Sequence, residues 1–363
     1  MSAPARPPEG RAPGPARVLV IDASDDARRA LIESIDAQAA LRVVADAGTG
    51  GQALDLLTRT RADVVFVNGP LPGMDAFETT RRIMESSPVP IVLGTVADPN
   101  DDLAFRSLEA GAVACVADPI RSPPPRPGSA RRSNWLQTLQ AMAEVKVVRR
   151  RPLETAPASP RGYGRIRMIG IGASTGGPVV LQQILAALPQ AFPVPILVVQ
   201  HIARGFLPGM AEWLRQTVGL RVQIAAHGIV PAAGHVYLAP DDFQLGLSAG
   251  GALRLTRPDT DPGPRPSVAH LFRSLAEHLG PAAVGVLLTG MGRDGAAELR
   301  LMRERGAATI AQDRATSVVH GMPGEAIALG AASRVLPGDR IAPVLVDLVQ
   351  PAMAGFDGDA TEP

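Results

Sequence analysis

The segment 168–178 constrains the fold more than any other stretch of this chain. A short apolar run leads into Ser174, which stands among glycines, and a helical pattern begins at Pro178. In that pattern apolar residues recur at every fourth position (Val180, Ile184, Leu188). A strand that turns tightly into a helix brings its serine to the carboxyl edge of a sheet, beside the free N–H groups of the new helix. The segment therefore predicts a serine placed for nucleophilic attack, with donors for an oxyanion nearby.

Two other interpretations of this segment compete with catalysis. Gly-x-Ser-x-Gly arises by chance in a glycine-rich chain, and this chain has 37 glycines. The glycines also resemble a loose dinucleotide-binding fingerprint, which needs an acidic residue roughly 20 positions downstream to bind the ribose. No Asp or Glu lies between Ser174 and His201. The dinucleotide interpretation is therefore disfavoured, and the rest of the chain must decide about catalysis.

The length of the chain predicts more than one domain. Its 363 residues exceed the size of a typical single domain, about 150 residues. Composition shifts divide it into a first domain, a Pro-, Ser- and Gly-containing linker, a second domain and two disordered tails (15–148, 149–164, 165–350, 1–14 and 351–363, respectively).

Charge and patterning exclude several classes of protein. The net charge of +1 gives no general attraction to nucleic acid or a membrane, and the arginines of the linker are typical of a solvated segment. No apolar run approaches the roughly 18 residues of a membrane span. The single cysteine, Cys115, excludes an internal disulfide, and no cluster predicts a metal site. We therefore expect a cytoplasmic protein without nucleic-acid binding, membrane insertion or a cofactor.

Five short apolar segments alternate with helical patterns in the first domain. They lie at 17–21, 41–45, 63–67, 91–93 and 112–116. This alternation predicts a doubly wound parallel sheet of the flavodoxin-like kind, an α/β fold whose ligands collect at the carboxyl ends of the strands. The residues at or just after those ends are Asp22, Asn68, Thr95 and Asp118.

The first domain resembles the receiver domain of response regulators. The resemblance rests on residues 18–22, 71–75, Thr95 and 109–113. It implies a site in which an aspartate after the third strand accepts a phosphoryl group. In that site an acidic pair after the first strand holds Mg²⁺, and a lysine follows the fifth strand.

Three positions depart from the receiver pattern. Asn68 occupies the acceptor position, and its amide is no phosphoryl nucleophile. Ala23 removes one oxygen ligand for Mg²⁺, and Asp118 occupies the lysine position, where it repels phosphate. We therefore expect a pseudo-receiver that lacks Mg²⁺ and is not phosphorylated. Deamidation of Asn68, which precedes Gly69, is left open as a route to an aspartate.

Two further predicted strands of the second domain are followed by residues whose side chains can take part in catalysis. The apolar strand 194–200 is followed by His201, and the strand 283–288 is followed by Asp294. Because parallel strands present their carboxyl ends at one edge, we expect both residues near Ser174. The three are the residue types of a nucleophile, its base and the group that orients the base.

The alternatives for these residues are weaker. The other five histidines lack a strand-end context, and Asp294 alone could cap the helical stretch 296–303. The order Ser…His…Asp along the chain differs from the Ser…Asp…His order of the α/β-hydrolases, which argues against that superfamily.

The second domain resembles the catalytic domain of the chemotaxis protein-glutamate methylesterases, the CheB family. Matching segments are spread over the whole domain (170–177, 199–201, 234–240, 266–268, 271–274, 288–296, 311–313 and 316–323). Together with the receiver-like domain, the resemblance covers about residues 15–350. We therefore expect a second α/β domain with a mainly parallel sheet.

The resemblance implies hydrolysis of γ-glutamyl methyl esters on the cytoplasmic helices of methyl-accepting chemoreceptors, with deamidation of glutamines there. In this interpretation Ser174 attacks the acyl carbon, His201 is the general base and Asp294 orients His201. Backbone N–H groups around Met291 and near Ser174 and Thr175 form the oxyanion hole. The implied partners are the receptors and a chemotaxis-type histidine kinase or adaptor.

Other function classes stay as alternatives. A non-enzymatic adaptor of a chemotaxis-like array is the main one, because the first domain has already lost its chemistry. A serine hydrolase of small esters is another. A DNA-binding response regulator needs a helix-turn-helix, and the glycine-rich strands after residue 165 offer none.

Overall fold

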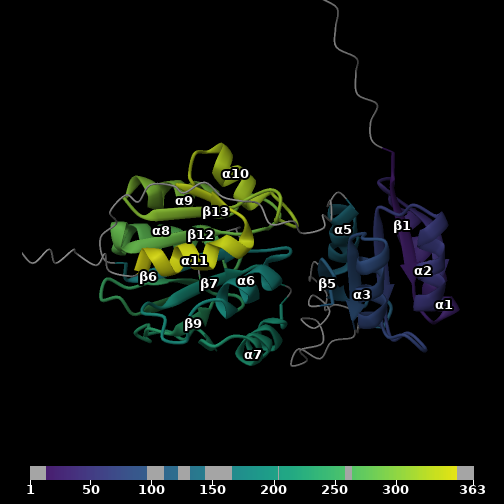
Figure 1. The fold of residues 1–363 in the computed structure, drawn as a ribbon, viewed down its shortest axis with the longest axis horizontal. Helices are drawn as coiled ribbons and strands as arrows, with labels where there is room; N and C mark the ends of the chain where they lie inside the picture. The colour runs from purple at the N-terminus through teal and green to yellow at the C-terminus, as the bar shows by residue number, and fades with distance from the viewer. Residues whose placement is uncertain are drawn as a thin grey trace, which may run out of the picture. The chain divides into compact units, whose positions relative to one another are not determined.

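A computed structural model of the protein describes residues 14–95, 110–121, 131–143, 166–202, 204–257 and 264–349. The chain forms two compact units, and the described residues up to 143 belong to the first while those from 166 belong to the second (Figure 1). The expected linker lies outside the described residues, as do both expected tails apart from Gly14. The domain boundaries therefore stay predictions.

The first unit is built on a five-stranded sheet. Its strands are β1 (Ala16–Ile21), β2 (Leu41–Ala47), β3 (Val64–Asn68), β4 (Ile91–Thr95) and β5 (Ala114–Ala117). Their order is β2-β1-β3-β4-β5, and every neighbouring pair is parallel. This is the flavodoxin-like order, which confirms the expected fold class. The fifth strand starts two residues later than predicted, because the turn at Gly111 delays it.

The helices described in the first unit are α1 (Asp25–Asp36), α2 (Gly50–Arg59), α3 (Ala76–Ser86) and α5 (Arg131–Ala143). Ser24 caps α1 by accepting the Ala27 N–H at 3.3 Å, and Asp25 and Asp26 lie in its first turn. There the two carboxylates complement the helix dipole. Helix α5 carries Trp135, whose ring lies 5.3 Å from that of Phe66.

The second unit holds a seven-stranded parallel sheet. Its strands are β6 (Met168–Ala173), β7 (Ile196–Gln200), β8 (Arg221–Ile224), β9 (His235–Leu238), β12 (Ala283–Leu287), β13 (Ala308–Gln312) and β14 (Arg334–Leu336). The order is β14-β13-β12-β6-β7-β9-β8. Two further strands, β10 (Gln244–Leu247) and β11 (Leu253–Thr256), pair antiparallel beside it. The expected mainly parallel sheet is confirmed, with β6 near its centre.

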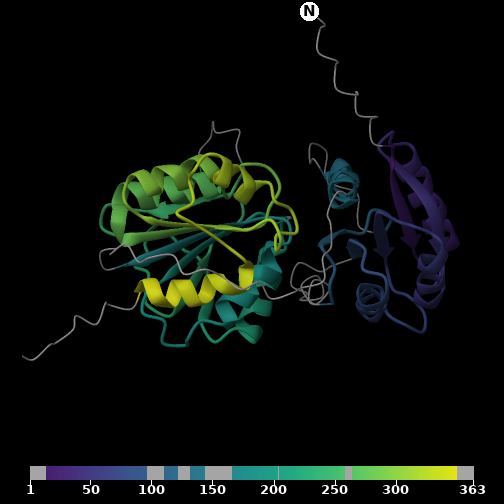
Figure 2. The same cartoon turned by 45° about the horizontal axis from the view of Figure 1, so that its top comes forward.

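Helices cover both faces of this sheet. Helices α8 (Val268–His278) and α9 (Ala296–Glu304) lie on one face, whereas α6 (Gly177–Ala186) and α11 (Gly338–Val349) lie on the other (Figure 2). The unit also contains α7 (Leu207–Thr217), α10 (Met322–Ala328) and a 3₁₀ turn, η1 (Gly280–Ala282). In the described parts of the chain, none of the helices has the length and apolar character of a membrane span.

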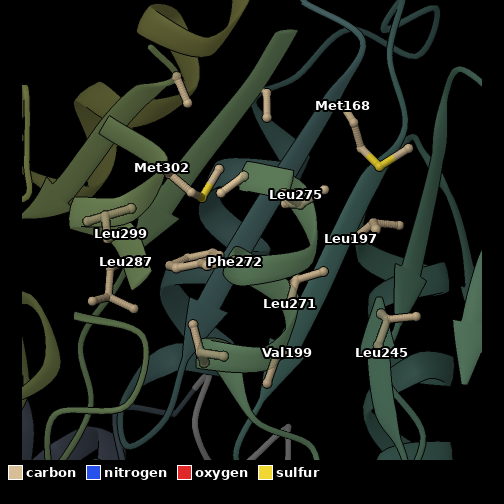
Figure 3. Close-up of a cluster of buried hydrophobic side chains, with 14 of the residues drawn as sticks. Met168, Leu197, Val199, Leu245, Leu271, Phe272, Leu275, Leu287, Leu299 and Met302 are labelled. Carbon is tan, nitrogen blue, oxygen red and sulfur yellow. The ribbon is translucent and has the colours of Figure 1, made fainter. Parts of the chain in front are cut away.

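The core of the second unit brings α8 directly onto the central strand. Leu271, Phe272 and Leu275 of α8 are fully buried among side chains of the sheet (Figure 3). An ideal Cβ at Gly170 would lie 2.4 Å from Leu275, and one at Gly172 would lie 2.3 Å from Val268. Because these strand positions have no side chain, the N-terminus of α8 reaches the edge of the sheet where β6 ends.

Candidate active site

Ser174 lies in the turn that joins β6 to α6. Gly176 caps α6 with φ +77°, a left-handed conformation that favours glycine, and Pro178 lies in the first turn of the helix. An ideal Cβ at Gly176 would lie 2.5 Å from Val318, and one at Gly177 would lie 2.4 Å from the Gln200 amide. The predicted strand–turn–helix arrangement is therefore present. Because these glycines have no Cβ, the side chains of Val318 and Gln200 can pack against the turn.

His201 follows the neighbouring strand. Strand β7 pairs with β6 so that Gln200 lies opposite Ala173, and the His201 N–H donates to the Ala173 carbonyl at 2.9 Å. Ser174 and His201 are therefore the first residues after two paired strand ends, as the sequence predicted. The Ser174 hydroxyl has no hydrogen-bond partner among the described residues.

Asp294 meets His201 at the same edge. Its Oδ2 lies 2.9 Å from His201 Nε2, and both side chains are largely buried. The pair has the distance of an ion pair but not the alignment of a hydrogen bond. With Nε2 facing the carboxylate, Nδ1 is the ring nitrogen left to act on a nucleophile.

The carboxylate of Asp294 also binds the N-terminus of α8. It accepts the Val268 N–H at 2.7 Å, the Ala269 N–H at 3.0 Å and the Ser267 hydroxyl at 3.0 Å. Burial alone raises the pKa of Asp294. The close approach and charge of His201, together with the N–H groups of α8, outweigh this effect, so the pKa lies below its usual value. The carboxylate is therefore ionised at neutral pH.

The alternative role for Asp294, capping its own helix, is wrong. Gly295 occupies the cap of α9 with φ +82°, and no side chain caps that helix. The residue lies beyond the end of β12, and its carboxylate turns toward α8 and His201.

At this edge the N–H groups of Thr175 and Met291 donate to no partner among the described residues. Met291 is 58% exposed, and the preceding Gly290 packs so closely that an ideal Cβ would lie 2.7 Å from Ser174 Cβ. The N–H of Ser174 itself is unavailable, because it donates to the Thr289 carbonyl at 3.0 Å. This engagement removes one of the donors that the sequence analysis placed near the oxyanion.

Several polar residues of the site were missed at the sequence level. They are Gln200, Ser267 and Thr289, and all three are buried. Gln200 donates to the Ser174 carbonyl, Ser267 donates to the Asp294 carboxylate, and Thr289 donates to the Thr175 carbonyl. Gln200 and Thr289 share a signal: a polar residue stands at or just after the end of an otherwise apolar strand. Ser267 caps α8, as a serine before an apolar helical stretch predicts.

The receiver-like unit has a different site at its own sheet edge. Asp22, Asn68 and Asp118 are almost fully buried there. Arg121, which the sequence analysis did not single out, donates to both carboxylate oxygens of Asp22 at 2.7 and 2.8 Å and to Asp118 at 3.0 Å. Asn68 Nδ2 donates to Asp22 at 2.8 Å. Thr95 ends β4, and its side chain lies outside the described parts.

This cluster does not fit a bound Mg²⁺. The guanidinium of Arg121 and the amide of Asn68 already satisfy the oxygens of Asp22, which would otherwise be the hard ligands of the ion. Burial raises the pKa of Asp22, but hydrogen bonds from Arg121, Ser24 and Asn68 outweigh it and hold the pKa below its usual value. The guanidinium of Arg121 therefore occupies the oxygens that the receiver resemblance would assign to Mg²⁺.

A parallel α/β sheet that gathers a serine, a histidine and an ionised aspartate at one edge is typical of serine-dependent hydrolases. Residues 169–345 match the CheB methylesterase family, and residues 18–123 match the response regulator receiver domain. The chain belongs to the protein-glutamate methylesterase/protein-glutamine glutaminase family, whose members are carboxylic ester hydrolases, and the resemblance found in the sequence is confirmed.

The relatives cover both units of the chain. A protein-glutamate methylesterase/protein-glutamine glutaminase of Syntrophus aciditrophicus is 44% identical over 92% of this chain and 98% of its own length. One of Nitrosospira multiformis is 43% identical over 92% and 96%, respectively. The crystal structure of the Thermotoga maritima CheB methylesterase catalytic domain is 40% identical, with a TM-score of 0.49, covering 51% of this chain and 100% of that one.

Proposed function

We propose that the protein hydrolyses γ-glutamyl methyl esters on the cytoplasmic helices of chemoreceptors and deamidates glutamines there. The names of its relatives support this substrate class. The observation that carries the proposal is the meeting of Ser174, His201 and Asp294 at adjoining strand ends, with an ion-pair distance of 2.9 Å between the last two.

In the proposed reaction Ser174 Oγ attacks the side-chain acyl carbon, and His201 Nδ1 takes its proton. The oxyanion that forms on the carbonyl oxygen is bound by the N–H groups of Thr175 and Met291. His201 then returns the proton to the leaving methoxide or amide, which departs as methanol or ammonia. Water hydrolyses the acyl group left on Ser174 by the reverse sequence, which yields glutamate.

Asp294 supports this sequence through charge. Its pKa lies below the usual value despite burial, because His201 and the N-terminus of α8 favour the charged form. A fixed carboxylate stabilises the imidazolium that forms when His201 takes the proton of Ser174.

We further propose that Asp phosphorylation of the receiver-like unit does not control the enzyme. Asn68 has no carboxylate to accept a phosphoryl group, and Arg121 occupies the oxygens of Asp22 that Mg²⁺ would need. In this proposal the receiver-like unit either inhibits the enzyme or binds a partner protein. The partner is a histidine kinase, an adaptor or the receptor itself.

Methanol release from a methylated receptor fragment tests the activity. Wild-type protein should release methanol, and Ser174→Ala protein should not, while Ser248→Ala serves as a matched control at a loop away from the site. Mass spectrometry of the receptor reports deamidation in the same samples. Receptor binding without methanol release from several receptors would instead support the adaptor.

A further inference from the structure

Gln200 is a buried polar residue at the end of β7 whose contacts span the site. Its side chain is 4% exposed. Nε2 donates to the Ser174 carbonyl at 2.8 Å and to the His201 carbonyl at 2.9 Å. One amide group thus connects the backbone of the proposed nucleophile with that of the proposed base.

The orientation of this amide is fixed by its surroundings. Both partners are carbonyl oxygens, which only accept hydrogen bonds, so the NH₂ end must face them. Oε1 points the other way, is buried and has no partner among the described residues. It lies 2.4 Å from the place of a Cβ at Gly177, so that glycine provides the space for it.

Gln200 also fixes the direction of the Thr175 N–H. The Ser174 carbonyl accepts from Gln200 and from the Gly177 N–H, which lies 2.8 Å away. In a trans peptide the N–H points opposite to the carbonyl of the same plane. Holding the Ser174 carbonyl toward Gln200 therefore turns the unpartnered Thr175 N–H away from the interior.

The next peptide is held in the same manner by Thr289. Its hydroxyl donates to the Thr175 carbonyl at 2.9 Å, and its own carbonyl accepts the Ser174 N–H at 3.0 Å. Thr289 is fully buried and also makes hydrogen bonds with Val319 and Gln312, but Gln200 joins the turn to the backbone of His201.

We propose that Gln200 is a positioning residue for catalysis: its amide aims the Thr175 N–H at the oxyanion and sets the spacing between the Ser174 turn and His201. This inference rests on the proposed function, because it assigns Gln200 a role in that reaction.

The test compares Gln200→Glu and Gln200→Met with wild type, with Gln223→Glu on β8 as the matched control. Glutamate keeps the shape of the side chain but loses the NH₂ donors, and methionine keeps the approximate size without any hydrogen bond. Methanol release from a methylated receptor fragment gives kcat and KM between about pH 5.5 and pH 8. Mass spectrometry gives the rate at which an alkyl fluorophosphonate labels Ser174, a reaction that needs the oxyanion site but no receptor.

We expect kcat and the labelling rate to fall about 100-fold in both variants at pH 8, the scale of a misplaced catalytic group, with KM nearly unchanged. For Gln200→Glu, kcat and the labelling rate, each divided by the wild-type value, should rise as the pH falls, because a protonated carboxyl regains one O–H donor. In Gln200→Met the ratio should stay constant with pH. Gln223→Glu should behave as wild type.

The outcomes separate this inference from the proposed function. Wild-type levels of kcat and labelling in both variants would overturn the inference alone. A pH-independent loss in Gln200→Glu, or failure of both variants to fold, would also overturn it, since Gln200 would then be structural. Wild-type protein that is labelled at Ser174 but releases no methanol would overturn the substrate class, and the labelling ratios would still decide about Gln200. Absence of both reactions in wild type would overturn both.

Discussion

His201 Nε2 lies 2.9 Å from Asp294 Oδ2, and the same oxygen accepts the Val268 N–H from the first turn of α8. The carboxylate thus joins a residue at the end of β7 to the N-terminus of a helix that packs on β6. This arrangement holds negative charge beside the imidazole without placing Asp294 in solvent. Substitution of Asp294 tests what this arrangement contributes to the reaction.

Asp294→Asn should lower kcat for methanol release by about 10⁴-fold, the scale seen when an amide replaces the orienting carboxylate of a serine hydrolase. The amide cannot accept from α8 with both of its terminal atoms, and it brings no charge to the imidazolium. Steady-state kinetics on a methylated receptor fragment measure the effect, with Asp339→Asn, an exposed position in the first turn of α11, as control. A variant within tenfold of wild type would remove Asp294 from the proposed mechanism.

Arg121→Met should destabilise the receiver-like unit by about 3 to 5 kcal/mol, because it leaves the buried carboxylates of Asp22 and Asp118 without a counter-charge. Trp135 packs against Phe66 in this unit, so its fluorescence in a Trp213→Phe background reports unfolding by urea. Arg29→Met, which breaks an exposed ion pair with Asp26, should have little effect. If Mg²⁺ raised the free energy of unfolding of the wild-type protein, this would contradict the conclusion that Arg121 occupies the oxygens of Asp22 that Mg²⁺ would need.

The receiver-like unit should lose stability on acidification, in part through Asp22. The pKa of Asp22 is lower in the folded protein than in the unfolded chain. Its contribution to the free energy of unfolding is therefore complete above the unfolded pKa, about 3.9, and is lost as the pH falls through the folded pKa. Urea unfolding followed by Trp135 should show a steeper loss of stability below about pH 4 in wild type than in Asp22→Asn. Equal pH dependence in the two proteins would refute this contribution.

Asn68 should resist deamidation in the folded protein, although Gly69 follows it. The reaction requires the Gly69 nitrogen to attack the Asn68 side-chain carbon, but the Gly69 N–H donates to the Gly94 carbonyl at 3.3 Å and Asn68 is fully buried. Peptide mass spectrometry of protein aged with and without urea should find an aspartate or isoaspartate at position 68 in the unfolded sample alone. Accumulation of aspartate at position 68 in the native sample would provide a phosphoryl acceptor and would contradict the proposal that this unit is not phosphorylated.

The fold and the three residues Ser174, His201 and Asp294 were predictable because strand ends are visible in a sequence. An apolar run that stops at a polar residue marks the edge of a parallel sheet, and parallel strands share that edge. The exact start of β5 was not predictable in this way, because a turn before a short strand has the same apolar residues as the strand itself.

The supporting contacts were not predictable, because they join positions far apart in the chain. Arg121 reaches Asp22 across 99 positions, and nothing in the local sequence distinguishes it from a solvated arginine. The binding of Asp294 to the first turn of α8 likewise depends on how α8 packs against Gly170 and Gly172. The sequence therefore predicted where the three proposed reacting groups lie better than it predicted the groups that contact them.

We propose that the protein is an active ester hydrolase whose receiver-like unit is not a phosphorylation switch. The initial rate of methanol release from a methylated receptor fragment, measured with and without acetyl phosphate and Mg²⁺, tests both parts together. We predict a rate that depends on Ser174 and is equal under the two conditions, with no phosphorylated species in the intact mass. A rate that rises with the phosphodonor, together with a phosphorylated protein, would contradict the account.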